Sequence, residues 1–185
     1  NGETASPPWF RTDRVNGRPV VEFKEPSHHL DIPRFSAKHL AGKPFTIFMV
    51  ARSGDLQFGF SGNSLSGSGG IPRLYVTRGS LHFDELRGIP TGAPAGKAAI
   101  NTYLYDGSLL QTWVDGKPRG RREQRETVAA FGSGGHFAIP FWSASQFRGG
   151  EMAEIAVFDC ALADTERVGV EANLADKYGI HERPK

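Results

Sequence analysis

The sequence has a single cysteine, Cys160, among its 185 residues. One cysteine cannot form an intrachain disulfide, so the fold must rest on a hydrophobic core, and Cys160 itself is expected to be a small buried hydrophobe within an apolar run. No apolar run approaches the roughly 20 residues that a membrane-spanning helix needs. We find no nucleophile elbow, phosphate-binding loop or zinc-ligand spacing. These absences exclude several common classes of enzyme and membrane protein.

The net charge is also small. The chain carries 22 basic and 20 acidic residues, for a formal charge of +2, which does not indicate a nucleic-acid partner. The local exception is "GKPRGRREQR" at 116–125, where one acid, Glu123, stands among five basic residues, Lys117, Arg119, Arg121, Arg122 and Arg125. This segment is either a solvated hairpin loop or a surface for an anionic glycan, because arginine grips sulfate or carboxylate with two parallel hydrogen bonds.

Glycine (23), proline (12) and phenylalanine (13) are abundant. Short alternating apolar runs, separated by turn-forming residues, predict an all-β antiparallel sandwich or barrel. The run at 45–52 is apolar on both faces and is expected to be a central strand. The strands are predicted at 19–23, 30–32, 45–52, 56–60, 73–76, 81–83, 100–105, 109–114, 136–139 and 152–158.

One helix is predicted, within 161–180. Val170, Leu174 and Tyr178 are spaced by four residues and form an apolar stripe. Glu166 suits the first turn, and Gly179 is a good residue to end the helix.

The C-terminal stretch "FRGGEMAEIAVFDCALADTERVGVEANLADKYGI" resembles the closing segment of the laminin-G-like, concanavalin A-like jelly rolls of bacterial secreted proteins. The segments "NGRPVVEF", "KPFTIFMVAR" and "LLQTWVDGKP" resemble earlier strands of that family, so the resemblance covers about residues 16–181. Three departures stand out: Ala163 replaces the usual capping serine, "PPWFR" stands where a Trp-Asp stretch is common, and "PFWSAS" replaces a short loop. The matching residues are Gly149, Glu154, Asp159, Leu162, Glu166, Arg167, Leu174, Lys177, Tyr178 and Gly179.

The resembled family includes glucanases and polysaccharide lyases. A retaining glucanase needs two carboxylates about 5–5.5 Å apart, and on one strand these must be an even number of residues apart. Glu154 and Asp159 are five residues apart and fail this condition. Glu154, a carboxylate within an apolar strand, is instead expected to accept backbone N–H bonds from a neighbouring loop. His28 and His29 are expected at the surface or rim. No catalytic residue is assigned, and carboxylate pairs from different strands stay open.

No cofactor is certain, but many laminin-G-like domains bind calcium at a rim. Asp55, Asp84 and Asp106 are loop acids of suitable chemistry, and they are the metal-ligand candidates that the resemblance implies.

Exposed aromatics are the main ligand-binding candidates, because a flat ring suits the apolar face of a sugar. Trp9, Trp113 and Trp142 come first, each with packing in the core or under a loop as the alternative. Phe141 precedes Trp142 in "AIPFWSASQF", and we expect Phe141 to fill the core while Trp142 faces a ligand. Arg119, Arg121 and Arg122 complete the predicted binding residues.

We therefore predict one jelly-roll domain, 1–185, with a short C-terminal helix. The resemblance implies a noncatalytic carbohydrate-binding module of a larger bacterial protein, secreted, periplasmic or at the cell surface, whose partner is a polysaccharide and neither nucleic acid nor a membrane interior. The first residues, "NGETASPPWF", are interpreted as an interior cut or a mature end. The alternatives are a protein-interaction domain without a sugar ligand, and a glycoside hydrolase or polysaccharide lyase of the same fold.

Overall fold

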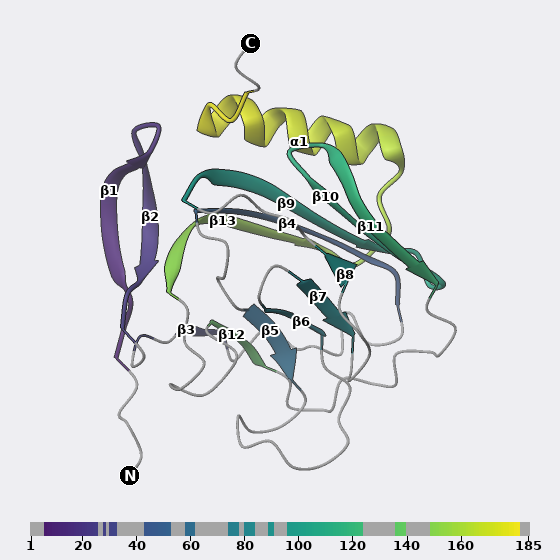
Figure 1. Cartoon of the computed structure of the whole chain (residues 1–185), viewed down its shortest axis with the longest axis horizontal. Helices are drawn as coiled ribbons and strands as arrows, with labels where there is room; N and C mark the ends of the chain where they lie inside the picture. The colour runs from purple at the N-terminus through teal and green to yellow at the C-terminus, as the bar shows by residue number, and fades with distance from the viewer. Residues whose placement is uncertain are drawn as a thin grey trace.

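The computed structural model describes the chain from residue 6 to residue 181, with several gaps between strands (Figure 1). At residues 31–32, in the strands between residues 58 and 90 and in strand 136–139, only the backbone is described. Among the described residues, no helix has the length and apolar character needed to cross a membrane. The described residues are 6–25, 28, 30–32, 43–52, 58–61, 74–77, 80–83, 89–90, 96–123, 136–139 and 149–181.

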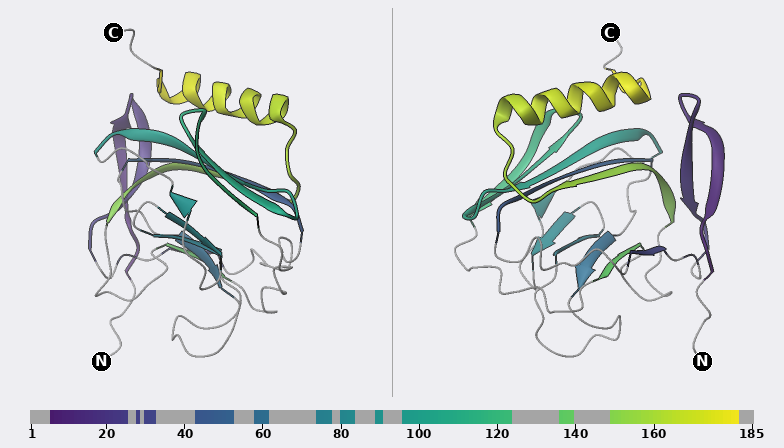
Figure 2. Two further views of the ribbon diagram at one scale, coloured as in Figure 1. Left: turned by 45° about the vertical axis from the view of Figure 1, so that its right-hand side comes forward. Right: turned by 180° about the vertical axis from the view of Figure 1, so that it is seen from behind.

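The described strands form two antiparallel sheets, stacked one above the other in Figures 1 and 2, which confirms the predicted antiparallel sandwich. The six-stranded sheet runs β3 (Leu30–Ile32), β12 (His136–Ile139), β5 (Phe58–Ser61), β6 (Leu74–Thr77), β7 (Ser80–Phe83) and β8 (Ile89–Pro90). The seven-stranded sheet runs β1 (Trp9–Val15), β2 (Arg18–Phe23), β13 (Gly150–Phe158), β4 (Phe45–Arg52), β9 (Ala98–Tyr105), β10 (Leu109–Val114) and β11 (Lys117–Glu123).

Strand β4 is the middle strand of the seven, as its apolar run predicts, and all of it except Arg52 is buried. Its two faces meet different layers because successive side chains of a strand point to opposite sides. Phe45, Ile47 and Met49 point away from the helix, toward the second sheet, whereas Phe48 packs beneath the helix. A strand covered on both sides needs no polar face, which explains the unbroken apolar run.

Helix α1 (Asp164–Tyr178) lies across the outer face of the seven-stranded sheet (Figures 1 and 2). It ends at Gly179, which adopts the left-handed conformation with φ 57°, as predicted. At its start Ala163 offers no capping side chain, but its N–H donates to Glu166 Oε2 at 2.9 Å. Leu174 and Tyr178 lie in the apolar cluster against the sheet, with Val170 at its margin.

The edge strands differ from the sequence-based expectation. Strand β1 occupies one edge and contains the "WFR" of the departing stretch, so an edge strand is present where the family motif is missing. Residues 117–123 of the basic segment form β11 at the other edge and are not a loop, whereas Arg125 lies outside the described residues. Cys160 is exposed in the bend after β13, contrary to the expected burial, because the apolar run ends at Phe158.

Candidate functional site

The start of the β1–β2 hairpin lines an open depression. The hairpin turn is Asn16-Gly17, with φ values of 48° and 78°, the positive values that a tight two-residue hairpin turn requires. The Asn16 side chain donates to the carbonyl oxygens of Tyr178 and Gly179, at the end of α1. The tip of the hairpin is therefore held against the helix.

A buried carboxylate holds the body of the hairpin to the sheet. Glu151 on β13 accepts a hydrogen bond from Arg14 Nε at 2.8 Å, and Arg52 Nε lies 3.3 Å from its other oxygen. Hydrogen bonding to Glu151 raises the pKa of Arg14 above its ordinary value. The three side chains link β1, β13 and β4, so this end of β1 is fixed in place.

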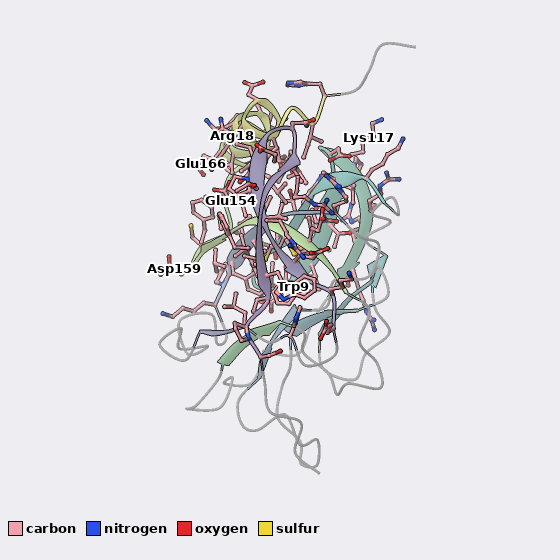
Figure 3. The ribbon with its side chains drawn as sticks, turned by 90° about the vertical axis from the view of Figure 1, so that its left-hand side faces the viewer. Trp9, Arg18, Lys117, Glu154, Asp159 and Glu166 are labelled. Carbon is pink, nitrogen blue, oxygen red and sulfur yellow. The ribbon has the colours of Figure 1, made fainter. Side chains whose placement is uncertain are left out.

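The depression itself has a volume of about 750 Å³ and opens at the start of β1. Figure 3 shows Trp9 at this end of the hairpin, far from the turn that approaches α1. The Arg11 guanidinium carbon lies 4.4 Å from the centre of the Trp9 ring, and Lys24 Nζ lies 5.3 Å from it. The lining residues are Ser6, Pro7, Pro8, Trp9, Phe10, Arg11, Glu25 and His28.

Trp9 is half-buried, and three neighbours hold its ring in place. The His28 ring meets it edge-on at 5.2 Å between centroids. His28 is 2% exposed, so the expectation of a surface histidine was wrong. Its Nδ1 accepts the N–H of Lys24 at 3.1 Å, which satisfies the buried ring and places it as a wall of the depression.

Phe10 is the most exposed large hydrophobic side chain among the described residues, at 70%. Its neighbour Trp9 was predicted from the sequence as a binding residue, whereas Phe10 was not. The adjacent pair Trp9-Phe10 could have indicated an exposed aromatic, because alternation along a strand sends one of two adjacent side chains to each face. An exposed ring beside an open depression is a surface on which an apolar ligand face can rest.

Charged groups border the aromatics. Arg11 Nε donates to Glu22 at 2.7 Å, and this hydrogen bond holds the pKa of Glu22 below its usual value. The same pairing orients Arg11 over Trp9. Glu25 is exposed at the rim and supplies a second carboxylate. The depression thus combines two aromatic rings with hydrogen-bonding groups of both signs.

Trp113 is not an exposed platform. It is 8% exposed and pairs with Thr102 across β9 and β10, on the face that α1 covers. The Arg167 guanidinium carbon from α1 lies 4.3 Å from the centre of its ring. The helix thus occupies the ring face that a sugar would need.

The predicted arginines lie along edge strand β11. Arg119 and Arg121 are exposed and Arg122 is half-buried, as the alternation of a strand requires. Arg121 stands opposite Gln111 and Arg122 opposite Leu110, so these two adjacent arginines project to different faces of the sheet. Only part of the basic segment can therefore meet one ligand at a time.

Asp106 is engaged within its own turn. Its Oδ1 accepts the N–H groups of Ser108 at 2.8 Å and Leu109 at 2.7 Å. Partial burial would raise the pKa of Asp106, but these donors hold it below its ordinary value. Among the described residues no cluster of three or more His, Cys, Asp or Glu could hold a metal. Asp55 and Asp84 lie outside the described residues, so calcium binding there stays a prediction.

Glu154 has a structural partner. It accepts a hydrogen bond from Lys177 Nζ of α1 at 2.8 Å, and this contact raises the pKa of Lys177. The expected partner was the backbone of a loop, and the observed partner is instead a side chain of the helix. Phe141 and Trp142 lie outside the described residues.

No model of a known protein family and no curated protein matches this sequence. Solved structures are similar. The CBM40 of the Ruminococcus gnavus IT-sialidase, bound to α2,3-sialyllactose, superposes with a TM-score of 0.61 at 14% identity, covering 82% of this chain and 95% of that one. Domain 4 of AbnA, a GH43 extracellular arabinanase from Geobacillus stearothermophilus, in complex with arabinotriose, gives 0.63 at 11% identity and covers 90% and 82%.

A third similar structure is the K499G mutant of the NanB sialidase from Streptococcus pneumoniae, with a TM-score of 0.57 and 14% identity over 79% of this chain. This chain spans only 26% of that sialidase chain. At such identities the similarities establish the fold, a β-sandwich jelly roll with one C-terminal helix.

Proposed function

We propose that this chain is a noncatalytic carbohydrate-binding module. The observation that carries the proposal is the open depression at the start of β1, where exposed Phe10 and half-buried Trp9 stand among Ser6, Arg11 and Glu25. Sugar rings offer an apolar C–H face and a rim of hydroxyls, which aromatic rings and charged or hydroxyl side chains complement. The likeness in fold to a carbohydrate-binding module, CBM40, supports the proposal. The site carries the argument, because function resides in sites and not in folds.

In this proposal a sugar ring rests on Phe10, and its hydroxyls meet Ser6 and Glu25, which also line the depression. Arg11 projects from the other face of β1, over Trp9. Covering about 50 Å² of apolar surface contributes on the order of 1 kcal/mol. One such contact gives weak affinity, which suits a module that acts together with others on a repeating polymer. We accordingly place it in a larger secreted or cell-surface bacterial protein.

Replacing Phe10 by alanine is expected to lower polysaccharide affinity about fivefold, the equivalent of about 1 kcal/mol. Affinity gel electrophoresis against neutral, sulfated and uronic polysaccharides measures this as lost retardation. Phe10→Tyr is the matched control, because it keeps the ring and should keep the retardation.

Equal retardation of Phe10→Ala and the parent protein would remove Phe10 from the site. If no polymer retards the parent protein, the carbohydrate proposal fails and a protein-interaction domain becomes the better interpretation. If a polymer is shortened during incubation, the chain is instead a hydrolase or lyase of the same fold.

The finer proposal is that the polysaccharide is anionic and that Arg119 and Arg121 contact its sulfate or carboxylate groups. Retardation by such a polymer should fall steeply between about 0.1 M and 1 M salt, because the screening length shortens from about 10 Å to about 3 Å. A double Arg119→Lys, Arg121→Lys variant keeps the charge but loses the bidentate hydrogen bonds of the guanidinium group. It should therefore bind more weakly than the parent protein. Salt-independent retardation would contradict this contact.

A further inference from the structure

A second concavity lies between α1 and the turn of the β10–β11 hairpin, far from Trp9. Its volume is about 400 Å³, within the range of ligand pockets. Figure 1 shows the hairpin turn reaching up beside the helix. A Cβ atom on Gly116 in that turn would lie 3.7 Å from Glu171 Oε2 of α1, so the turn and the helix bound one groove.

The floor of this groove is apolar. Val168 is 52% exposed, one of the two exposed large hydrophobic residues among those described. Ala172 and Ala175 continue its face of α1, and Ile180 follows the helix, all of them lining the groove. The described part of the lining contains no Phe, Tyr or Trp, so this groove lacks the large flat ring on which a sugar face rests.

One wall of the groove is cationic. Lys117 and Arg119 line it from β11, and both are exposed. The two carboxylates in the lining are already engaged: Glu171 accepts from Arg167 Nη1 and Thr102 Oγ1, each at 2.7 Å, and Asp115 Oδ1 accepts the Ile100 N–H at 2.8 Å.

The negative end of α1 adds little repulsion for an anion in the groove. Asn16 donates to the carbonyl oxygens of Tyr178 and Gly179, and Arg18 Nε donates to that of Lys177 at 3.3 Å. These donors satisfy carbonyls that would otherwise carry the partial negative charge of the helix end. His181, in the lining beyond the helix, lies 3.7 Å from Asp176 through Nε2.

We propose that this groove binds a peptide segment of a partner protein that carries both apolar and acidic side chains. Apolar side chains would cover Val168, Ala172 and Ile180, while carboxylates would pair with Arg119 and Lys117. This occupant matches both the floor and the wall, whereas a plain polyanion matches only the wall. A second copy of this surface would bring its own cations against Arg119, which like-charge repulsion opposes.

Fluorescence anisotropy with three short labelled peptides tests the proposal. One peptide alternates leucine with aspartate, one serine with aspartate, and one leucine with lysine. The first is expected to bind, and the other two are expected to bind at least about tenfold more weakly, because each lacks one half of the match. Equal binding of the serine–aspartate peptide would reduce the groove to nonspecific attraction of anions and overturn the proposal.

Variants locate the binding. Val168→Asp should weaken the leucine–aspartate peptide about tenfold, because a carboxylate replaces the apolar floor and repels the ligand. Thr165→Asp is the matched control: it adds the same charge at an exposed position of α1 outside the groove lining. Equal loss in both variants, or in neither, overturns the proposal. The proposed carbohydrate contact at Phe10 lies elsewhere, so its failure leaves this proposal standing. Arg119 is shared with the anionic-polysaccharide contact, and Val168→Asp against Thr165→Asp is the comparison that tests the groove alone.

Discussion

Glu171→Ala is expected to lower the free energy of unfolding by about 3–5 kcal/mol, the cost of leaving one member of a buried ion pair alone. Glu171 and Arg167 are 6% and 7% exposed beneath α1, and their side chains meet at 2.7 Å. Thr102 Oγ1 donates to the same carboxylate from β9. Without Glu171, the Arg167 charge would remain over the Trp113 ring with no partner of equal burial.

Urea denaturation followed by tryptophan fluorescence measures this effect. Asp164→Ala is the matched control, because Asp164 also lies near Arg167, at 3.5 Å, but its side chain is 89% exposed. Removing that exposed carboxylate should cost under about 1 kcal/mol, even counting its favourable place in the first turn of α1. If Glu171→Ala costs no more than Asp164→Ala, the buried pair does not stabilise the helix against the sheet.

Phe48→Ala is expected to cost about 3–5 kcal/mol, because a buried phenylalanine leaves a cavity that the surrounding core only partly fills. Phe48 is 1% exposed on β4, in the cluster that joins the sheet to α1. Its ring meets Phe158 edge-on, with 5.8 Å between centroids. Such an aromatic pair contributes stabilising free energy beyond that from burying the ring.

Phe10→Ala removes the same side chain from an exposed site and is the matched control for this second measurement. Its unfolding free energy should stay within about 0.5 kcal/mol of the parent protein. Similar losses from both variants would mean that α1 does not seal the outer face of the sheet around Phe48.

The strands were predictable where their side chains alternate or are apolar throughout. The runs at 45–52 and 109–114 form β4 and β10 with the predicted bounds, and Gly179 ends α1 as expected. Strand β11 was not predictable in this way, because its basic side chains carry no apolar alternation. It forms because the backbone of β10 offers it hydrogen-bonding partners.

Only part of the candidate site could be predicted from the sequence. Trp9 was identified as a binding residue, and it lines the depression at the start of β1, but Phe10 was missed. Which aromatic faces outward depends on the side of β1 that meets the rest of the protein. That choice follows from pairing with β2 and from the contact of Arg14 with Glu151, a residue distant in sequence.

The sequence by itself determined the strands whose side chains are apolar or alternate, the helix and the end of the helix, since these depend on side-chain periodicity and local backbone preference. The tertiary structure alone decided which surfaces are open. Helix α1 covers Trp113, the hairpin buries His28, and Arg167 and Glu171 enter the interior because each neutralises the other. Exposure depends on contacts between segments far apart in the chain, and no local pattern contains them.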